Sequence, residues 1–195
     1  GYYRPMVLLS FVLDRLVFGL NPAGYHFHSL VWHLLAVAGL AYIIEDLLGR
    51  GPALLGATLF ALHPVQSEVV IWVSARNDLM AAALGFSALG VMWKEDRPSW
   101  ARCLLAAILT TLAALSKETA FVLPLMFWAA ELGRRRTDGL WVRLAPFIVG
   151  VSLVVGTRVL LGLGGAVVPS SAGWVLLAKG AFELIGLTGA AVVSP

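Results

Sequence analysis

Residues 25–48 read YHFHSLVWHLLAVAGLAYIIEDLL, and this stretch decides the class of fold. A transmembrane helix needs about 20 consecutive, mainly apolar residues. The stretch satisfies that length, and its two acidic residues, Glu45 and Asp46, come only near its end. The tetrapeptide Asn21-Pro22-Ala23-Gly24 separates it from the preceding residues, as expected of a turn. We therefore expect residues 25–48 to form a helix that crosses a membrane.

The composition of the whole chain agrees with that expectation. Of its 195 residues, 59% are hydrophobic and 13% are charged, and the mean hydropathy is +0.87. Soluble domains are about one-quarter charged, so a soluble domain is excluded, and so is a disordered chain. The net charge of +3 is too small and too dispersed for a nucleic-acid-binding surface. Cys103 is the single cysteine, so no disulfide framework can form within the chain.

Further apolar stretches follow, separated by polar turns. They cover residues 53–73, 79–93, 104–115, 120–132, 144–163 and 174–193. His63-Pro64 interrupts the first of them, because proline removes a backbone hydrogen bond. Together these stretches predict an all-α, polytopic membrane helix bundle with about six to seven spans. Residues 2–20 carry charges on a helical pattern and predict an N-terminal helix that lies at the membrane interface.

The organisation expected from these segments is a single membrane domain over residues 1–195. Residues 1–20 form its interfacial helix and residues 25–193 its transmembrane helices. The chain begins with Gly1 and shows no signal-peptide pattern, and it ends just after an apolar stretch. We therefore expect it to be a fragment of a longer protein.

The distribution of basic residues predicts the orientation. If residues 25–48 run from outside to inside, three connecting loops face the cytoplasm. These loops hold eight of the fourteen lysines and arginines: Arg50, Lys94, Arg97, Arg102, Arg134, Arg135, Arg136 and Arg143. Cytoplasmic loops carry such an excess of Lys and Arg, so the run Arg134–Arg136 is interpreted as a topology signal.

With that orientation, the ionisable residues near the hydrocarbon collect on the outer side. They are His26, His33, His63, Glu68, Arg76, Asp78, Lys117, Glu118, Arg158, Lys179 and Glu183, with Arg4 in the N-terminal helix. Charges at membrane depth cost several kcal/mol unless they are paired or hydrated. We predict a hydrated functional cavity that opens to the outer leaflet. The alternative is ordinary polarity at loop ends together with structural ion pairs.

Several of these residues allow two interpretations. His26, Ser29 and His33 share one helical face and could bind a ligand or hydrogen-bond to another helix. Glu68 could contact Arg76 structurally, or the two could form an anion or sugar site. Asp78 could bind substrate or cap the helix that follows. Lys117 is expected to bind an anion, and Lys179 with Glu183 to form a structural pair.

Signatures of other enzyme classes are absent from the sequence. No phosphate-binding glycine loop, zincin helix or serine nucleophile elbow is found. The four histidines and single cysteine show no zinc spacing, so no metal site is predicted, although a divalent metal is not excluded.

Four blocks of sequence resemble one family. They are Tyr2-Tyr3-Arg4-Pro5, residues 18–26 (FGLNPAGYH) with His33, residues 63–79 (HPVQSEVVIWVSARNDL), and residues 116–120 (SKETA) with Pro124. Their order and spacing resemble the membrane part of the transmembrane and tetratricopeptide-repeat O-mannosyltransferases and their bacterial relatives. These belong to the GT-C class of polyprenyl-phosphate-sugar glycosyltransferases. The resemblance runs from Tyr2 to about Arg158. Ser29 stands where the family usually has Asn, and Gln66 where it often has a second His, which weakens a metal interpretation of that block.

The resemblance implies a reaction and a division of roles. A sugar, with mannose as one expectation, passes from a polyprenyl phosphate to an acceptor hydroxyl of a protein or glycan on the extracytoplasmic side. The cations available for the lipid phosphate are Arg4, Arg76, Lys117 and Arg158, while His26, His63, Glu68 and Asp78 hold the sugar or orient those cations. His33 and Glu118 complete the candidate substrate-binding set.

The resemblance also implies parts that lie outside this chain. The catalytic carboxylate, a general base, is expected in a loop before Tyr2, and the repeats are expected after Pro195. The fragment alone should then be inactive. The expected location is the bacterial inner membrane, or the endoplasmic reticulum membrane in a eukaryote. A membrane transporter or channel, and a non-catalytic scaffold for a repeat domain, are the alternatives.

Overall fold

The computed structural model describes residues 3–94 and 96–162, and within these residues all regular structure is helical. The helices are α1 (Pro5–Phe18), α2 (Pro22–Leu48), α3 (Arg50–Leu62), α4 (Pro64–Ile71), α5 (Arg76–Trp93), α6 (Trp100–Ser116), α7 (Leu123–Gly133) and α8 (Leu140–Leu160). Two short 3-10 helices, η1 (Val73–Ala75) and η2 (Glu118–Val122), precede α5 and α7. The all-α class predicted from the sequence is confirmed for this part of the chain.

Two of the described helices, α2 and α8, are long and apolar enough to cross a membrane. The pair α3 and α4 qualifies as a third crossing segment only when taken together, with a bend of 54° between them. The predicted long apolar helix over residues 25–48 is confirmed as part of α2. The number of six to seven spans stays a prediction, and the segment predicted over residues 174–193 lies outside the described residues.

The limits of α2 follow from local sequence. Asn21 precedes it, and the Asn21 side-chain oxygen accepts a hydrogen bond from the backbone N–H of Ala23 at 3.1 Å. This is the preferred N-cap chemistry, and Pro22 at the first position has a backbone angle suited to a helix start. The helix ends at Leu48 and is followed by Gly49, whose φ of 87° favours glycine.

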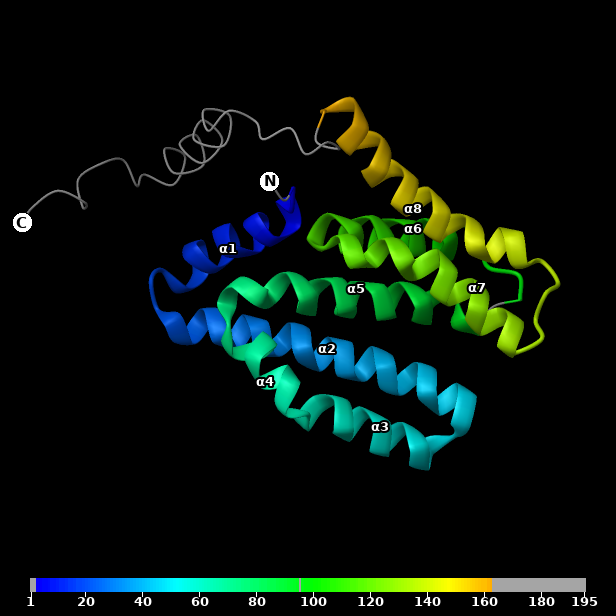
Figure 1. The fold of residues 1–195 in the computed structure, drawn as a ribbon, viewed down its shortest axis with the longest axis horizontal. Helices are drawn as coiled ribbons and strands as arrows, with labels where there is room; N and C mark the ends of the chain where they lie inside the picture. The colour runs from blue at the N-terminus through cyan, green and yellow to red at the C-terminus, as the bar shows by residue number, and fades with distance from the viewer. Residues whose placement is uncertain (1–2, 95, 163–195) are drawn as a thin grey trace, which may run out of the picture. The chain divides into compact units, whose positions relative to one another are not determined.

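Helix α5 forms the centre of the packed helices. It packs against α2 on one side and α6 on the other (Figure 1). Its buried face combines large side chains, such as Met80 and Trp93, with alanines and Gly85. Small residues let apolar helices approach closely in a membrane. At Gly39 of α2, for example, an added Cβ would lie 2.8 Å from the Cβ of Phe86 in α5.

A similar close approach joins α8 to α6 and gives a stability prediction. A Cβ added at Gly150 of α8 would lie 2.8 Å from the Thr110 Cβ and 2.9 Å from the Ala107 carbonyl oxygen of α6. Overpacking of this kind destabilises by about 1–3 kcal/mol. Gly150→Ala should therefore lower the thermal unfolding midpoint of the protein in detergent. Gly156→Ala is the matched control, because nothing lies within 4 Å of a Cβ there. Equal midpoints for the two variants would contradict the close packing.

The outward faces of these helices are strongly apolar. Exposed side chains include Leu8, Leu9, Leu16, Leu54, Leu55, Leu59, Leu104, Leu153 and Val159. Soluble monomers rarely expose apolar surface on this scale. These faces are suited to lipid, in agreement with the crossing helices and with a membrane protein.

Candidate functional site

A buried ion pair joins α1 to the start of α5. The Asp14 carboxylate and the Arg76 guanidinium contact each other with side-chain exposures of 1% and 0%. Arg76 also donates from Nε to the Ser29 hydroxyl at 3.2 Å and from a terminal nitrogen to the Tyr25 carbonyl at 2.8 Å. A buried charge costs free energy unless it is paired and hydrogen-bonded, and this arrangement meets both needs.

His28 of α2 completes this group, which we call the Asp14 cluster (Asp14, His28, Ser29 and Arg76). Its Nδ1 contacts the Asp14 carboxylate, and its Nε2 accepts a hydrogen bond from the Trp32 indole N–H at 3.0 Å. With Nε2 as acceptor, a neutral imidazole carries its proton on Nδ1 and donates it to Asp14. The cluster therefore holds α1, α2 and α5 together through satisfied polar groups.

Two further pairs lie near this cluster and are only partly buried; we call them the rim pairs. Lys117 contacts Asp78, with side-chain exposures of 24% and 41%. Arg4 contacts Glu118 at 3.0 Å, with exposures of 24% and 31%. The structure thus brings together four residues that the sequence named as candidates. Asp78 comes from α5, Arg4 directly precedes α1, and Lys117 and Glu118 lie at the junction between α6 and η2.

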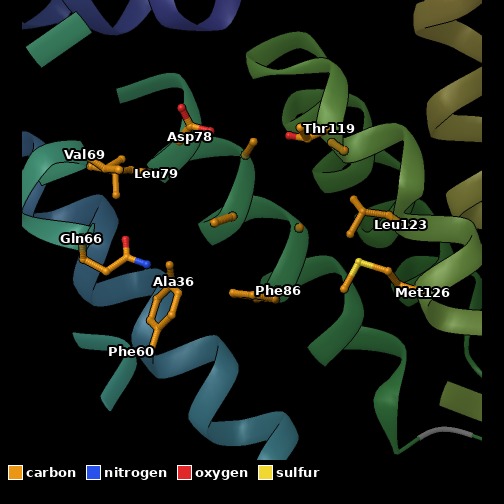
Figure 2. A pocket seen from close by; sticks show the side chains of 14 residues that line it. Ala36, Phe60, Gln66, Val69, Asp78, Leu79, Phe86, Thr119, Leu123 and Met126 are labelled. Carbon is orange, nitrogen blue, oxygen red and sulfur yellow. The ribbon is translucent and has the colours of Figure 1, made fainter. Parts of the chain in front are cut away.

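A cavity of about 350 Å³ lies beside the Lys117–Asp78 pair, and Asp78 is part of its lining. Its walls are mostly apolar and include Ala36, Phe60, Leu79, Phe86, Leu123 and Met126. Asp78, Gln66 and Thr119 supply polar groups to its lining. Figure 2 shows Asp78 and Thr119 at one end of the cavity, with Phe60 and Phe86 farther along it. The arrangement suits a ligand with an apolar body and a polar head.

A comparison with known protein families decides the affiliation of the chain. The model of the dolichyl-phosphate-mannose-protein mannosyltransferases matches residues 5–159. The chain belongs to this mannosyltransferase family. The resemblance to O-mannosyltransferases inferred from the four sequence blocks is thereby confirmed.

Curated relatives of this chain are similar to it over only part of their length. Protein O-mannosyl-transferase TMTC1 of Mus musculus is 34% identical over 60% of the chain and 14% of the relative. Protein O-mannosyl-transferase Tmtc1 of Drosophila melanogaster is 31% identical over 71% of the chain and 17% of the relative. Protein O-mannosyl-transferase TMTC3 of Mus musculus is 29% identical, over 13% of the relative. The chain thus spans less than one-fifth of these proteins. No solved structure matches it.

The other candidate residues in the described part of the chain are His26, His33, His63, Glu68 and Arg158. His26 and Glu68 are exposed, and exposed His63 caps α4 by accepting from the Val65 N–H at 3.2 Å. His33 is buried, donates toward the Ala61 carbonyl at 3.2 Å and stacks on Phe60, a residue of the cavity wall. Arg158 lies in the last turn of α8. Lys179 and Glu183 lie outside the described residues.

Two sequence interpretations are wrong. Asp78 does not cap α5, because the helix starts at Arg76 and its N-cap is Ala75. Asp78 instead lies in the first turn, where a negative charge still interacts favourably with the helix dipole. The possible contact of Glu68 with Arg76 is not formed, because Arg76 pairs with Asp14 instead. The spacing of the two residues was taken from one continuous helix, whereas α4 ends at Ile71 and Trp72 has an extended ψ of 103°.

The candidates named from the sequence include Arg76 but neither its partner Asp14 nor His28, which contacts Asp14. Asp14 lies in the segment predicted to be an interfacial helix. A signal was present, because an acidic residue inside an apolar helix needs a partner when it is buried. Among residues 3–94 and 96–162, no three His, Cys, Asp or Glu side chains are placed to hold a metal ion.

Proposed function

We propose that this chain is part of a membrane glycosyltransferase that transfers mannose from a polyprenyl phosphate to a hydroxyl of a protein acceptor. The observation that carries the proposal is the apolar cavity with Asp78, the partner of Lys117, at one end. A polyprenyl phosphate has the same division, with a long apolar chain and an anionic head. Family membership and the names of the relatives support mannose as the sugar and protein as the acceptor.

The rim pairs provide cations that a phosphate can recruit. Lys117 and Arg4 are partly exposed, and each is held by a carboxylate. A phosphate oxygen forms strong charge-assisted hydrogen bonds with such groups and can replace the carboxylate as their partner. The departing lipid phosphate gains negative charge as the sugar leaves it, so these cations stabilise the transition state more than the ground state.

The wider architecture in this proposal follows the family resemblance. The complete membrane domain has a GT-C-like bundle of about six to seven spans, with residues 1–20 at the interface and the site on the extracytoplasmic side. The base is a carboxylate in polypeptide preceding Tyr2, so residues 1–195 alone are inactive. The host membrane is the bacterial inner membrane or, in a eukaryote, that of the endoplasmic reticulum.

Filling the cavity tests the proposal directly. Ala82 lines it on α5, so Ala82→Phe in the full-length protein should raise the KM for a polyprenyl-phosphate-mannose donor about tenfold or more. Ala38→Phe is the matched control, because Ala38 lies on an exposed part of α2. Transfer is measured with purified donor and an acceptor peptide in detergent. Equal KM values for Ala82→Phe and Ala38→Phe would show that the cavity does not hold the donor.

A non-catalytic scaffold is the second candidate. The observation in its favour is that carboxylates of this chain already occupy Lys117 and Arg4 as partners. The same assay separates the two functions, because a scaffold of normal stability would transfer no mannose in its full-length form.

A further inference from the structure

A second polar cluster is built from the α5–α6 loop and the α7–α8 loop, away in sequence from every residue of the rim pairs. Its centre is a buried ion pair between Glu131 of α7 and Arg143 of α8, with side-chain exposures of 0% and 1%. Arg143 also donates to the carbonyl oxygens of Arg136 and Asp138 at 2.7 and 3.0 Å. The pair therefore fixes the loop between α7 and α8 against the start of α8.

Two other arginines connect that loop to the end of α5, and one of them also contacts Asp46 of α2. Arg134 donates to the Trp93 carbonyl at 2.7 Å and to the Asp46 carboxylate at 2.8 Å. Arg136 donates to the same Trp93 carbonyl at 3.0 Å and pairs with Asp96. Arg135, between them, adopts a φ of 55°, a left-handed conformation that is uncommon for a residue other than glycine. The run predicted to be a topology signal is thus a structured element.

These loops enclose a polar pocket of about 590 Å³. Its lining consists of Asp96, Arg97, Arg135, Arg136, Thr137, Asp138, Gly139 and Arg143. Four guanidinium groups therefore face two carboxylates in the described lining. We call it the arginine pocket.

Part of this positive charge is not neutralised by the described residues. Arg97 and Arg135 are exposed and form no ion pair with any of them. The Nε of Arg143 is buried and has no hydrogen-bond partner there, although its other nitrogens are engaged. Arg136, by its hydrogen bond and its charge, and then Arg143 and Arg134 by charge, lower the pKa of Asp96. The pocket therefore combines positive potential with unused N–H donors.

Two tryptophans mark the level of the pocket relative to a bilayer. Trp100 begins α6 and Trp141 lies in the first turn of α8, with exposures of 79% and 74%. Tryptophan concentrates at the level of the lipid headgroups, where its ring contacts apolar chains and its N–H contacts water. Gly139 of the lining directly precedes α8, whose N-terminus adds a partial positive charge.

We propose that the arginine pocket binds the phosphate group of an anionic phospholipid. Arginine matches phosphate oxygens with a fork of N–H donors, and basic pockets near helix ends bind anionic headgroups. In this binding mode Arg97 and Arg135 contact the phosphate from the two loops, and the Arg143 Nε faces it from below. The lipid is a structural partner that fixes the two loops, and it takes no part in sugar transfer.

Binding is tested with the full-length protein and phosphatidylglycerol, measured by native mass spectrometry after titration in detergent. Arg135→Gln should lower the affinity about tenfold, because one charge-assisted contact is lost. Arg50→Gln is the matched control: it removes the same charge from an exposed position that does not line the pocket. Arg97→Gln with Arg135→Gln should lower the affinity further, and circular dichroism confirms that each variant is folded.

Two more arms identify the source of the phosphate. Phosphatidylcholine has a phosphate but no net charge and should bind more weakly than phosphatidylglycerol. If dissolved glycerol phosphate competes with the lipid, a soluble phosphate also fits the pocket. If glycerol phosphate does not compete, the pocket is specific for the lipid. Equal affinities for Arg135→Gln and Arg50→Gln, or equal binding of the two lipids, would overturn the proposal. None of these readouts depends on mannose transfer.

Discussion

Replacing Arg76 with methionine should lower the free energy of unfolding by about 3–5 kcal/mol, because it leaves a buried carboxylate without its cation. Asp14 is 1% exposed and has no access to water that could replace the guanidinium. The variant also leaves the Ser29 hydroxyl and the Tyr25 carbonyl without the donor they use in the native protein. Thermal unfolding in detergent, followed by circular dichroism, measures the loss.

A double variant separates charge pairing from packing. Adding Asp14→Leu to Arg76→Met removes both charges, so it should recover part of the stability that the single change loses. Arg50→Met is the control for removal of an exposed arginine and should stay within about 0.5 kcal/mol of the native protein. If Arg76→Met unfolds at the same temperature as Arg50→Met, the Asp14 cluster does not hold α1, α2 and α5 together.

Replacing Lys117 with methionine should lower the rate of sugar transfer by the full-length protein about a hundredfold, which corresponds to about 2.7 kcal/mol of transition-state stabilisation. Its ammonium group is a compact charge suited to a phosphate oxygen. Stability should change little, because a pair as exposed as Lys117 with Asp78 contributes about 0–1 kcal/mol. Transfer from a polyprenyl-phosphate-mannose donor and thermal unfolding are both measured.

The control for this experiment is Lys94→Met. Lys94 is also paired with an aspartate, Asp46 at 3.3 Å, but it does not belong to the rim pairs. Its replacement should leave transfer unchanged. Lys117→Arg keeps the charge but not the geometry and should retain part of the activity. Normal transfer by Lys117→Met together with a lowered unfolding temperature would mean that Lys117 is only a structural partner of Asp78.

The features that could be predicted correctly depend only on residues that are close to one another in the sequence. An apolar run of sufficient length indicates a membrane helix whatever it packs against, and α2 follows this rule. Proline acts on its own backbone, so the break between α3 and α4 at His63-Pro64 could also be predicted. The rim residues could be named as candidates because charged groups at membrane depth are rare enough to be noticed singly.

The pairing of those charges could not be predicted, because it depends on how helices pack. Arg76 contacts Asp14, which is 62 positions away in the sequence, and Lys117 contacts Asp78, which is 39 positions away. The possible contact of Glu68 with Arg76 was inferred from the spacing of a continuous helix, and η1 interrupts that helix. Glu131 lies in an apolar segment near a basic run, and its burial against Arg143 appears only when α7 and α8 are placed together.

The bend between α3 and α4 has a consequence for the surrounding bilayer. Helix α3 has 13 residues and exposes several leucines, so its apolar side is about 20 Å long at 1.5 Å per residue. The hydrocarbon layer is about 30 Å thick. Because α4 turns away by 54°, the pair does not extend straight through that thickness. Lipids beside α3 must shorten or tilt to cover it, so the membrane is expected to be locally thin next to the α4 residues that line the cavity.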